Sequence, residues 1–356
     1  MTQENKKNGE RSLWPYLVMF AIAMLTGFAF FSYFDNQKIV TEKEEIFSRS
    51  KTTQKKLAPL RIGYITDAHC YSKINKENGK WEPNWRCKDP LNAFARQMNE
   101  EFKPNFVIEG GDLTDGRDDR PFESFLLAKE LYEQVDAPKY HVLGNHEADN
   151  FPKEKWLETV GYKKAYYSFD VDGYRIFVLD GNYKPSTEED PRPVGPDENK
   201  YYQGFIDQKQ LRWLEKLLQK SNDFVKIVFV HQPPIDDAVG RNESEMMFNA
   251  KEVRAIFSKY QVRAVFSGHI EEFCALEADG VDYYVLQGFY KDNRRLEAHQ
   301  RFKDAGVFSE VIITNDESKV KVYYVEERDG TLVSMSLNQE TAVCNNSSVK
   351  IKEKSE

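Results

Sequence analysis

The chain has 356 residues, of which 30% are charged and 40% are hydrophobic, and its formal net charge at pH 7 is −8. This is the composition of a globular protein, and the acidic balance excludes a nucleic-acid binder that covers phosphates with Lys and Arg, so no nucleic-acid-binding surface is evident. The 4 cysteines are too few for a disulfide scaffold, and they form no CxxC pair of the kind that holds structural zinc.

The first 57 residues predict a membrane anchor. A polar tail (1–12) precedes an uncharged run (13–34) of about 22 residues, which is long enough to cross a bilayer as a helix. The competing interpretation is a signal peptide, but the bulky residues Phe31 and Phe34 at the end of the run argue against a cleavage site. We therefore expect a single-pass membrane protein in which a polar linker (35–57) follows the transmembrane helix.

The orientation of this anchor is weakly indicated, because Lys and Arg flank the span in similar numbers on both sides. A short N-terminal tail followed by a long folded domain favours placing that domain on the outer, extracytoplasmic face. No pattern in the chain indicates an oligomeric state.

A folded domain is predicted from residue 58 to 338, followed by a polar tail (339–356). The predicted strands are Arg61–Thr66, Asn105–Glu109, Tyr140–Leu143, Tyr166–Val171, Tyr174–Leu179, Val225–Val230, Val262–Ser267, Tyr283–Leu286, Glu310–Thr314 and Lys319–Val325. The predicted helices lie near 90–102, 121–135, 153–160, 207–220 and 250–259. Strands that alternate with helices and are followed by further strands indicate an α/β domain, and the proline-rich residues 183–203 indicate a long surface loop.

Two cysteines lie near the candidate site described next. Cys70 directly follows one candidate ligand and Cys274 lies just past another, and we expect both to be small buried side chains. A disulfide, for instance between Cys70 and Cys87, is the alternative if the domain sits in an oxidising compartment.

Five predicted strands each end in a turn that carries side chains able to bind a metal ion. These side chains are, in chain order, Asp67 and His69, then Asp112, then Asn145 and His146, then His231, and finally His269 and Glu271. Alone, each has a plain interpretation as a turn residue or a hydrogen-bonded residue. However, four of the chain's 6 His share this setting, and groups beyond the C-terminal ends of strands converge on one crevice of an α/β sheet. His141 and His299 lack the setting and are assigned to structure.

These blocks, in this order, resemble the calcineurin-like metallophosphoesterase superfamily. Its pattern is Asp-x-His, Gly-Asp, Gly-Asn-His-Glu/Asp, His and Gly-His-x-His. The residues between the blocks (Tyr166–Asp170, Ile176–Asp180 and Gln208–Glu215) are similar to the branch that contains class III cyclic nucleotide phosphodiesterases and purple-acid-phosphatase-like enzymes. The resemblance covers roughly residues 60 to 290. It implies a four-layer αββα sandwich after the N-terminal transmembrane helix.

The resemblance also implies a site for two metal ions. Asp67, His69, Asp112 and Glu271 would hold the first ion, and Asp112, Asn145, His231 and His269 would hold the second. Asp112 would thus bridge the two ions. His146 would face the substrate, where it stabilises phosphoryl oxygens or protonates the leaving group, with Glu147 as the residue that could orient it. Asn145 and Arg117 are further candidate substrate contacts.

One position departs from the family pattern, because Glu271 stands where the pattern has His. A carboxylate ligand keeps the first ion and favours harder metals such as Mn or Fe, with Zn as a possible occupant. The alternatives are a weakened first ion or a shifted alignment that uses Glu272 instead.

The implied function is hydrolysis of a phosphomonoester or phosphodiester by a hydroxide that two metal ions activate, with His146, Asp112 and Asn145 as the catalytic residues. A pyrophosphate or lipid-linked phosphate at the membrane is an alternative substrate, which the anchor motivates. A catalytically degenerate binding protein on the same fold is a third possibility, and Glu271 is the observation behind it.

Overall fold

The structure, a computed structural model, describes residues 56–75, 78–83, 85–116, 119–185, 203–235, 246–271, 273–286, 288, 306–326 and 331–337. The predicted transmembrane run (13–34) lies outside these residues and stays a prediction, as does the C-terminal tail. Within the part of the chain that the structure describes, every helix is too short or too polar to cross a bilayer. The chain divides into two units, Met1–Lys56 and Leu57–Glu356, and all elements below belong to the second.

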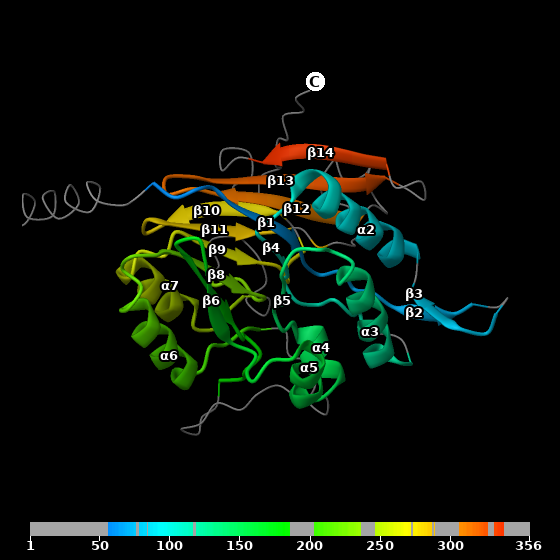
Figure 1. Cartoon of the computed structure of the whole chain (residues 1–356). Coiled ribbons are helices and arrows are strands. Elements are labelled where there is room, and N and C mark those ends of the chain that lie inside the picture. The colour runs from blue at the N-terminus through cyan, green and yellow to red at the C-terminus, as the bar shows by residue number, and fades with distance from the viewer. Residues whose placement is uncertain are drawn as a thin grey trace, which may run out of the picture. The chain divides into compact units, whose positions relative to one another are not determined.

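Two six-stranded sheets form the centre of this unit (Figure 1). The first has the order β14-β13-β12-β1-β4-β5 and contains β1 (Leu60–Ile65), β4 (Phe106–Glu109), β5 (Lys139–His141), β12 (Gly306–Ile313), β13 (Ser318–Glu326) and β14 (Thr331–Leu337). The second has the order β10-β11-β9-β8-β7-β6 and contains β6 (Tyr167–Val171), β7 (Tyr174–Leu179), β8 (Val225–Val230), β9 (Ala264–Ser267), β10 (Cys274–Ala278) and β11 (Val281–Val285). Strands β1, β4 and β5 are parallel to one another, and so are β7, β8 and β9.

The two sheets pack face to face around the main hydrophobic core. Tyr64 of β1 meets Phe229 of β8 with the ring centroids 5.8 Å apart, and both are buried. Because successive side chains of a strand point to opposite faces, the neighbouring residues Val228 and Val230 point outward, where helices cover them. Strand β8 is therefore buried on both faces, which explains its nearly continuous apolar sequence.

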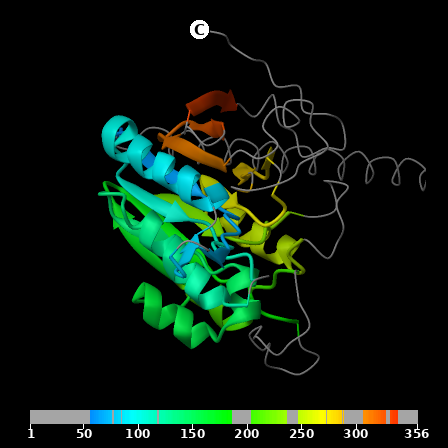
Figure 2. The same ribbon diagram turned by 90° about the vertical axis from the view of Figure 1, so that its right-hand side faces the viewer.

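Helices form the two outer layers (Figure 2). The first sheet is covered by α2 (Trp85–Arg96), its continuation as a π-helical turn η1 (Gln97–Phe102), α3 (Pro121–Tyr132) and α5 (Lys153–Val160), and the second by α6 (Gln208–Leu218) and α7 (Ala250–Lys259). A short helix, α4 (Asn145–Asn150), follows β5. This is the predicted αββα order of layers.

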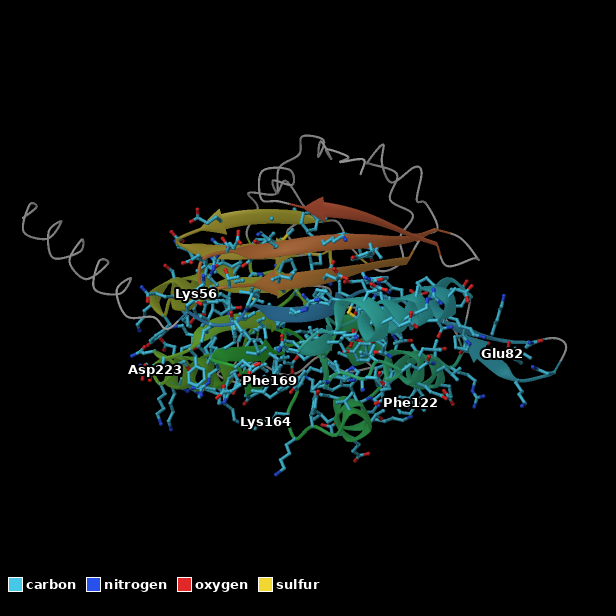
Figure 3. The ribbon with its side chains drawn as sticks, turned by 45° about the horizontal axis from the view of Figure 1, so that its top comes forward. Lys56, Glu82, Phe122, Lys164, Phe169 and Asp223 are labelled. Atoms are coloured by element: carbon cyan, nitrogen blue, oxygen red, sulfur yellow. A yellow bond between two sulfur atoms is a disulfide. The ribbon has the colours of Figure 1, made fainter. Side chains whose placement is uncertain are left out.

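A hairpin of β2 (Ser72–Ile74) and β3 (Trp81–Pro83) projects from the body of this unit, where Glu82 marks it in Figure 3. It lies within the segment closed by a disulfide between Cys70 and Cys87, whose Cα atoms are 5.4 Å apart. Cys70 and Cys274 are both buried, as expected, but none of the described cysteines is a free thiol, and the alternative pairing of Cys70 with Cys87 is the one observed. Helix α2 begins at Trp85 and so brings Cys87, which is also buried, against the turn after β1.

Candidate metal centre

The predicted metal-binding side chains gather at the C-terminal ends of both sets of parallel strands. Asp67, His69, Asp112 and Asn145 follow β1, β4 and β5 of the first sheet, while His231, His269 and Glu271 follow β8 and β9 of the second. Hydrogen bonds join these turns across the sandwich. The backbone N–H of His269 donates to the Asp67 carboxylate at 2.9 Å, so the two sheets meet at the site itself.

Five of these residues have left-handed backbone conformations. The φ angles are 50° for Asp67, 45° for His69, 57° for Asp112, 70° for His269 and 49° for Glu271. Each such residue costs about 1–3 kcal/mol and persists only where surrounding contacts enforce it. Backbone bonds of 2.9 Å from Asp67 to Gly111 and from His69 to Asp112 supply part of that constraint. Backbone strain is thus concentrated where the ligand candidates lie.

Gly111 is required where the loop after β4 turns. Its φ is +100°, and a Cβ there would lie 2.5 Å from Nδ1 of His231. The absence of a side chain lets His231 approach, and its Nδ1–H donates to the carbonyl of Gly110 at 2.8 Å. This bond leaves Nε2 of His231 facing Asp112, 3.1 Å from its Oδ2.

Asp112 belongs to two groups of possible ligands. In one, ligand atoms of Asp112, His231 and His269 lie within 4.8 Å of one another, and in the other those of Asp67, His69 and Asp112 do. Asn145 joins the former group, because its Oδ1 lies 2.9 Å from Nδ1 of His269. One carboxylate shared by two clusters is the arrangement expected of a bridging ligand.

Glu271 lies with the group of Asp67 and His69. Its Oε1 is 3.3 Å from Nε2 of His69, and that nitrogen is 3.9 Å from Oδ1 of Asp67. Glu271 is partly accessible, with 19% of its side chain exposed, whereas Asp67 is fully buried. Glu272, the alternative partner, lies outside the described residues.

The buried carboxylates of this centre need nearby positive charge to stabilise their ionised form. Burial raises the pKa of Asp67 to about 6. Burial acts to lower the pKa of His69, but Glu271 and the charge of Asp112 outweigh it and raise that pKa to about 9. In the same way Asp112 and Asp67 overcome burial and raise the pKa of His231 to about 10. Without metal ions the site balances its carboxylates with protonated imidazoles, a role that bound cations can take over.

The donor set fits metal ions. Nε2 of His269 and Nδ2 of Asn145 are buried and have no hydrogen-bond partner among the described residues. A buried polar atom without a partner is costly, and in native sites it often marks the place of an ion or substrate. The Nδ2 of Asn145 cannot bind a cation, so it is free to donate to a substrate oxygen.

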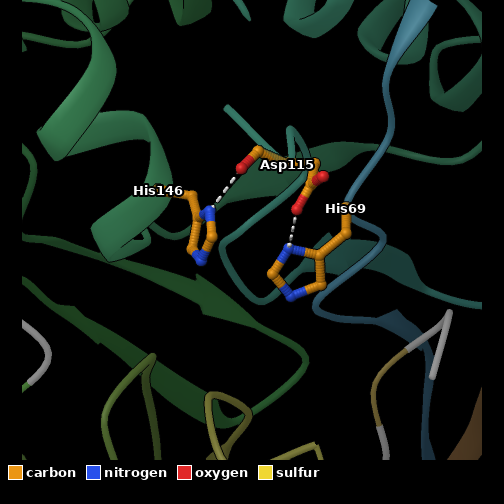
Figure 4. Close-up of side chains that lie close together, drawn as sticks. All are labelled: His69, Asp115 and His146. Carbon is orange, nitrogen blue, oxygen red and sulfur yellow. Dashed lines mark hydrogen bonds and ion pairs between the residues drawn. The ribbon is translucent and has the colours of Figure 1, made fainter. Parts of the chain in front are cut away.

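His146 lies beside this cluster and is held by Asp115 (Figure 4). Nδ1 of His146 lies 2.6 Å from the backbone carbonyl oxygen of Asp115, so this nitrogen donates and Nε2 faces the site, 3.9 Å from Oδ2 of Asp112. The Asp115 carboxylate reaches Nδ1 of His69 at 3.6 Å. A carboxylate behind a histidine orients the ring and favours binding through the other nitrogen.

Glu147 does not orient His146, contrary to the expectation from the sequence. Its buried carboxylate accepts backbone N–H groups of Asp112 at 2.9 Å and Thr114 at 3.0 Å instead. It therefore braces the turn that presents Asp112. The two residues are adjacent in the chain, but they point in different directions because α4 begins at this point.

The remaining sequence predictions divide into two groups. His141 is buried, 3.4 Å from Glu109 Oε2, and lies outside the clusters of possible ligands. Arg117 and His299 lie outside the residues that the structure describes, so their predicted roles stay predictions. Asp115 contacts two histidines, and its spacing from Asp112 along the chain does not by itself show these contacts.

Comparison with known proteins places these features in a family. The chain matches the family model named calcineurin-like phosphoesterase over residues 60–272. It is 30% identical over 205 residues to a manganese-dependent ADP-ribose/CDP-alcohol diphosphatase of Arabidopsis thaliana, with 48% of this chain and 65% of that protein covered. It is 29% identical over 178 residues to a probable glycerophosphodiester phosphodiesterase of Arcobacter nitrofigilis, with 48% and 56% covered. The chain thus spans less than two thirds of the length of these curated relatives.

The fold is also shared with a solved structure. A dimetal phosphatase from Danio rerio superimposes with a TM-score of 0.56 at 16% identity, and the match covers 78% of this chain and 98% of that one.

Proposed function

The chain belongs to the calcineurin-like phosphoesterase family, and on this premise we propose that it hydrolyses phosphate esters with the help of two bound metal ions. The observation that carries this proposal is the position of Asp112, which is shared by the group with His231 and His269 and the group with Asp67 and His69. An aspartate placed in this way can hold two cations side by side, as two-metal hydrolases require.

The first ion would be held by Asp67, His69, Asp112 and Glu271, and the second by Asp112, Asn145, His231 and His269. When bound, the two ions would activate water as the nucleophile and offset the charge of the phosphate oxygens. Asn145 has its amide N–H free to hold a phosphate oxygen. His146 would give a proton to the leaving oxygen, because the Asp115 carbonyl fixes its Nδ1 and leaves Nε2 toward the substrate.

The two ligand sets would differ in the metal ion that they prefer. The first set contains three carboxylates and one imidazole, which suits a hard ion such as Mn²⁺ or Fe, whereas the second set contains two imidazoles, an amide and the shared carboxylate. The Arabidopsis relative is manganese-dependent by name, which supports manganese for this chain. Glu271 is then an oxygen ligand in place of a nitrogen ligand, and the degenerate-binding alternative is disfavoured because Glu271 still faces His69 at 3.3 Å.

Two substrate classes are proposed for this site. The first is a phosphodiester or phosphomonoester, which the Arcobacter relative's name supports for the diester. The second is a diphosphate, because the Arabidopsis relative is a diphosphatase of ADP-ribose and CDP-alcohols. A lipid-linked diphosphate would combine this chemistry with the predicted anchor.

The proposal is tested with the full-length protein in detergent and Mn²⁺. Bis-p-nitrophenyl phosphate, p-nitrophenyl phosphate and ADP-ribose are supplied in parallel, with Asp112→Asn as the control. Turnover of at least one substrate that disappears in Asp112→Asn would support the proposal, and the relative rates would choose the substrate class. A folded wild-type protein that turns over none of the three would contradict it.

We also propose that the protein is anchored in a membrane by residues 13–34, with the domain on the outer face. The Cys70–Cys87 disulfide supports this side, because disulfides persist in oxidising compartments and are rare in the cytosol. Protease treatment of intact cells tests the orientation. Digestion of the domain without cell lysis is expected, and full protection until lysis would contradict the proposal.

A further inference from the structure

A buried polar network lies beside the ligand turns and has no part in the roles assigned above. It occupies the loop after β7, at the same edge of the second sheet as His231 and His269. Its central residue is Asn182, which is 2% exposed.

Asn182 connects two of the turns that carry candidate ligands. Its Nδ2 donates to the carbonyl of Leu143 at 2.8 Å, and its Oδ1 accepts from Nε2 of Gln232 at 2.9 Å. Leu143 lies two residues before Asn145, and Gln232 directly follows His231. One amide thus joins the turn of the first sheet that presents Asn145 to the turn of the second sheet that presents His231.

The loop that carries Asn182 is itself held from two sides. Asp180 accepts Nζ of Lys153, from α5, at 2.6 Å, and its backbone N–H and carbonyl bond to the side chain of Gln210 in α6. The Asp180 carboxylate also accepts the backbone N–H of Asn182 at 3.0 Å. Asn182 is therefore fixed by a helix of each outer layer.

The packing around Gln232 shows that this contact leaves little room for adjustment. A Cβ at Gly181 would lie 2.1 Å from Oε1 of Gln232, and one at Gly204 would lie 2.5 Å from its Cβ. Both positions must be free of side chains for Gln232 to reach Asn182.

We propose that Asn182 is a positioning residue for the second metal ion, which it serves by locking the Asn145 turn to the His231 turn. This inference rests on the proposed two-ion function. The ligands of the second ion come from both sheets, so their spacing depends on how the sheets are held together at this edge. The first ion depends on Asn182 less, because the turns after β1 and β4 are bonded directly to each other. Residues that orient metal ligands typically change metal affinity 10–100-fold when replaced.

The test compares Asn182→Ala and Gln232→Met with wild type. Gln232→Met keeps the length of the side chain and removes the amide, whose Nε2 donates to Asn182 and whose Oε1 has no hydrogen-bond partner among the described residues. Mn²⁺ titration followed by electron paramagnetic resonance separates single ions from coupled pairs at each metal level. We expect Asn182→Ala to weaken the second ion about 10–100-fold, so that a single-ion spectrum persists at two equivalents, while the first ion changes less than about 3-fold. Gln232→Met should shift the second ion in the same direction and by less.

The matched control is Asn99→Ala. Asn99, in η1, also donates to one backbone carbonyl (Gln134) and accepts one backbone N–H (Asp136), both at 2.9 Å, but these partners lie in the loop before β5, away from the strand ends that carry the ligands. It should lower the thermal midpoint without changing the affinity for either ion.

The outcomes separate this proposal from the function on which it rests. A wild-type protein that forms no coupled pair would overturn the two-ion function and the positioning role together. A wild-type pair that is unchanged in both Asn182→Ala and Gln232→Met, or two ions that weaken equally in Asn182→Ala, would overturn only the role of Asn182.

Discussion

His146 is the residue whose proposed role is most separable from metal binding. Its Nδ1 is fixed by a backbone carbonyl, and it lies outside the two groups of possible ligands that contain Asp112, while it forms a third group with His69 and Asp115. We expect His146→Gln to keep both ions and to lower kcat by about 10²–10⁴-fold on an alkyl phosphodiester. The loss should be smaller for a p-nitrophenyl ester, whose leaving group needs less protonation. Equal losses on the two esters, or loss of bound metal, would contradict a proton-donating role.

His69 and His231 determine how metal binding depends on pH. Their pKa values of about 9 and about 10 mean that both rings are protonated at pH 7 in the metal-free protein. A ligand nitrogen must lose its proton, so Mn²⁺ binding should release protons and tighten as pH rises from 7 toward 9. Calorimetry in buffers of different ionisation heat measures the release. An affinity that is constant over this range would contradict it.

The raised pKa values of His69 and His231 also affect the stability of the metal-free protein. This stability should fall as pH rises, whereas the affinity for Mn²⁺ should increase. Both folded-state pKa values are raised above the ordinary 6.5, so their contribution is complete below about pH 6.5 and is lost as pH rises through 9 to 10. Urea unfolding of the chelator-treated protein should therefore show a lower free energy of unfolding at pH 9.5 than at pH 7.

The identity of the candidate ligands was the part of the site that the sequence predicted best, and the reason is physical. Asp67, Asp112 and His231 each follow an apolar strand, so the sequence alone places them at strand ends. Asn182 also follows an apolar strand, but the sequence does not show its contacts, because its partners are a backbone carbonyl and a glutamine at other strand ends. Contacts of this kind depend on how the sheets are stacked.

At the scale of elements, the disulfide is the link most open to test. It ties the turn that carries His69 to α2, and it closes a segment of sequence separation 17. Replacing both Cys70 and Cys87 by Ala should lower the free energy of unfolding by about 3 kcal/mol, because the unfolded chain gains freedom. Denaturant unfolding under non-reducing conditions measures this difference. An unchanged free energy would show that the bridge does not constrain the fold.

Element boundaries were predicted well where apolar periodicity was strong. Strands β7 and β8 have the predicted limits. Helix α2 begins at Trp85 rather than near 90, and Pro90 lies inside it. Strands β2 and β3 and helix α4 were not predicted, since they are short and polar and are held by tertiary contacts rather than by their own pattern.

At the scale of the molecule, the stacking of two sheets was predicted from the family resemblance and not from the periodicity of apolar residues. Apolar strands are equally compatible with one large sheet. The pairing of β1 with β12 joins Leu60 to Ile313, two residues far apart in the sequence, and no local pattern encodes it. This stacking is what brings ligands from β1, β4 and β5 against those from β8 and β9.

The number of metal ions per chain tests the central claim most directly. The full-length protein, loaded with Mn²⁺ and freed of excess metal, would be analysed by elemental analysis and electron paramagnetic resonance beside Asp112→Asn. We predict two ions per chain with a coupled signal in the wild type, and at most one uncoupled ion in the variant, because the shared carboxylate is removed. One ion or none in a folded wild-type protein would contradict the account, and so would an unchanged coupled pair in Asp112→Asn.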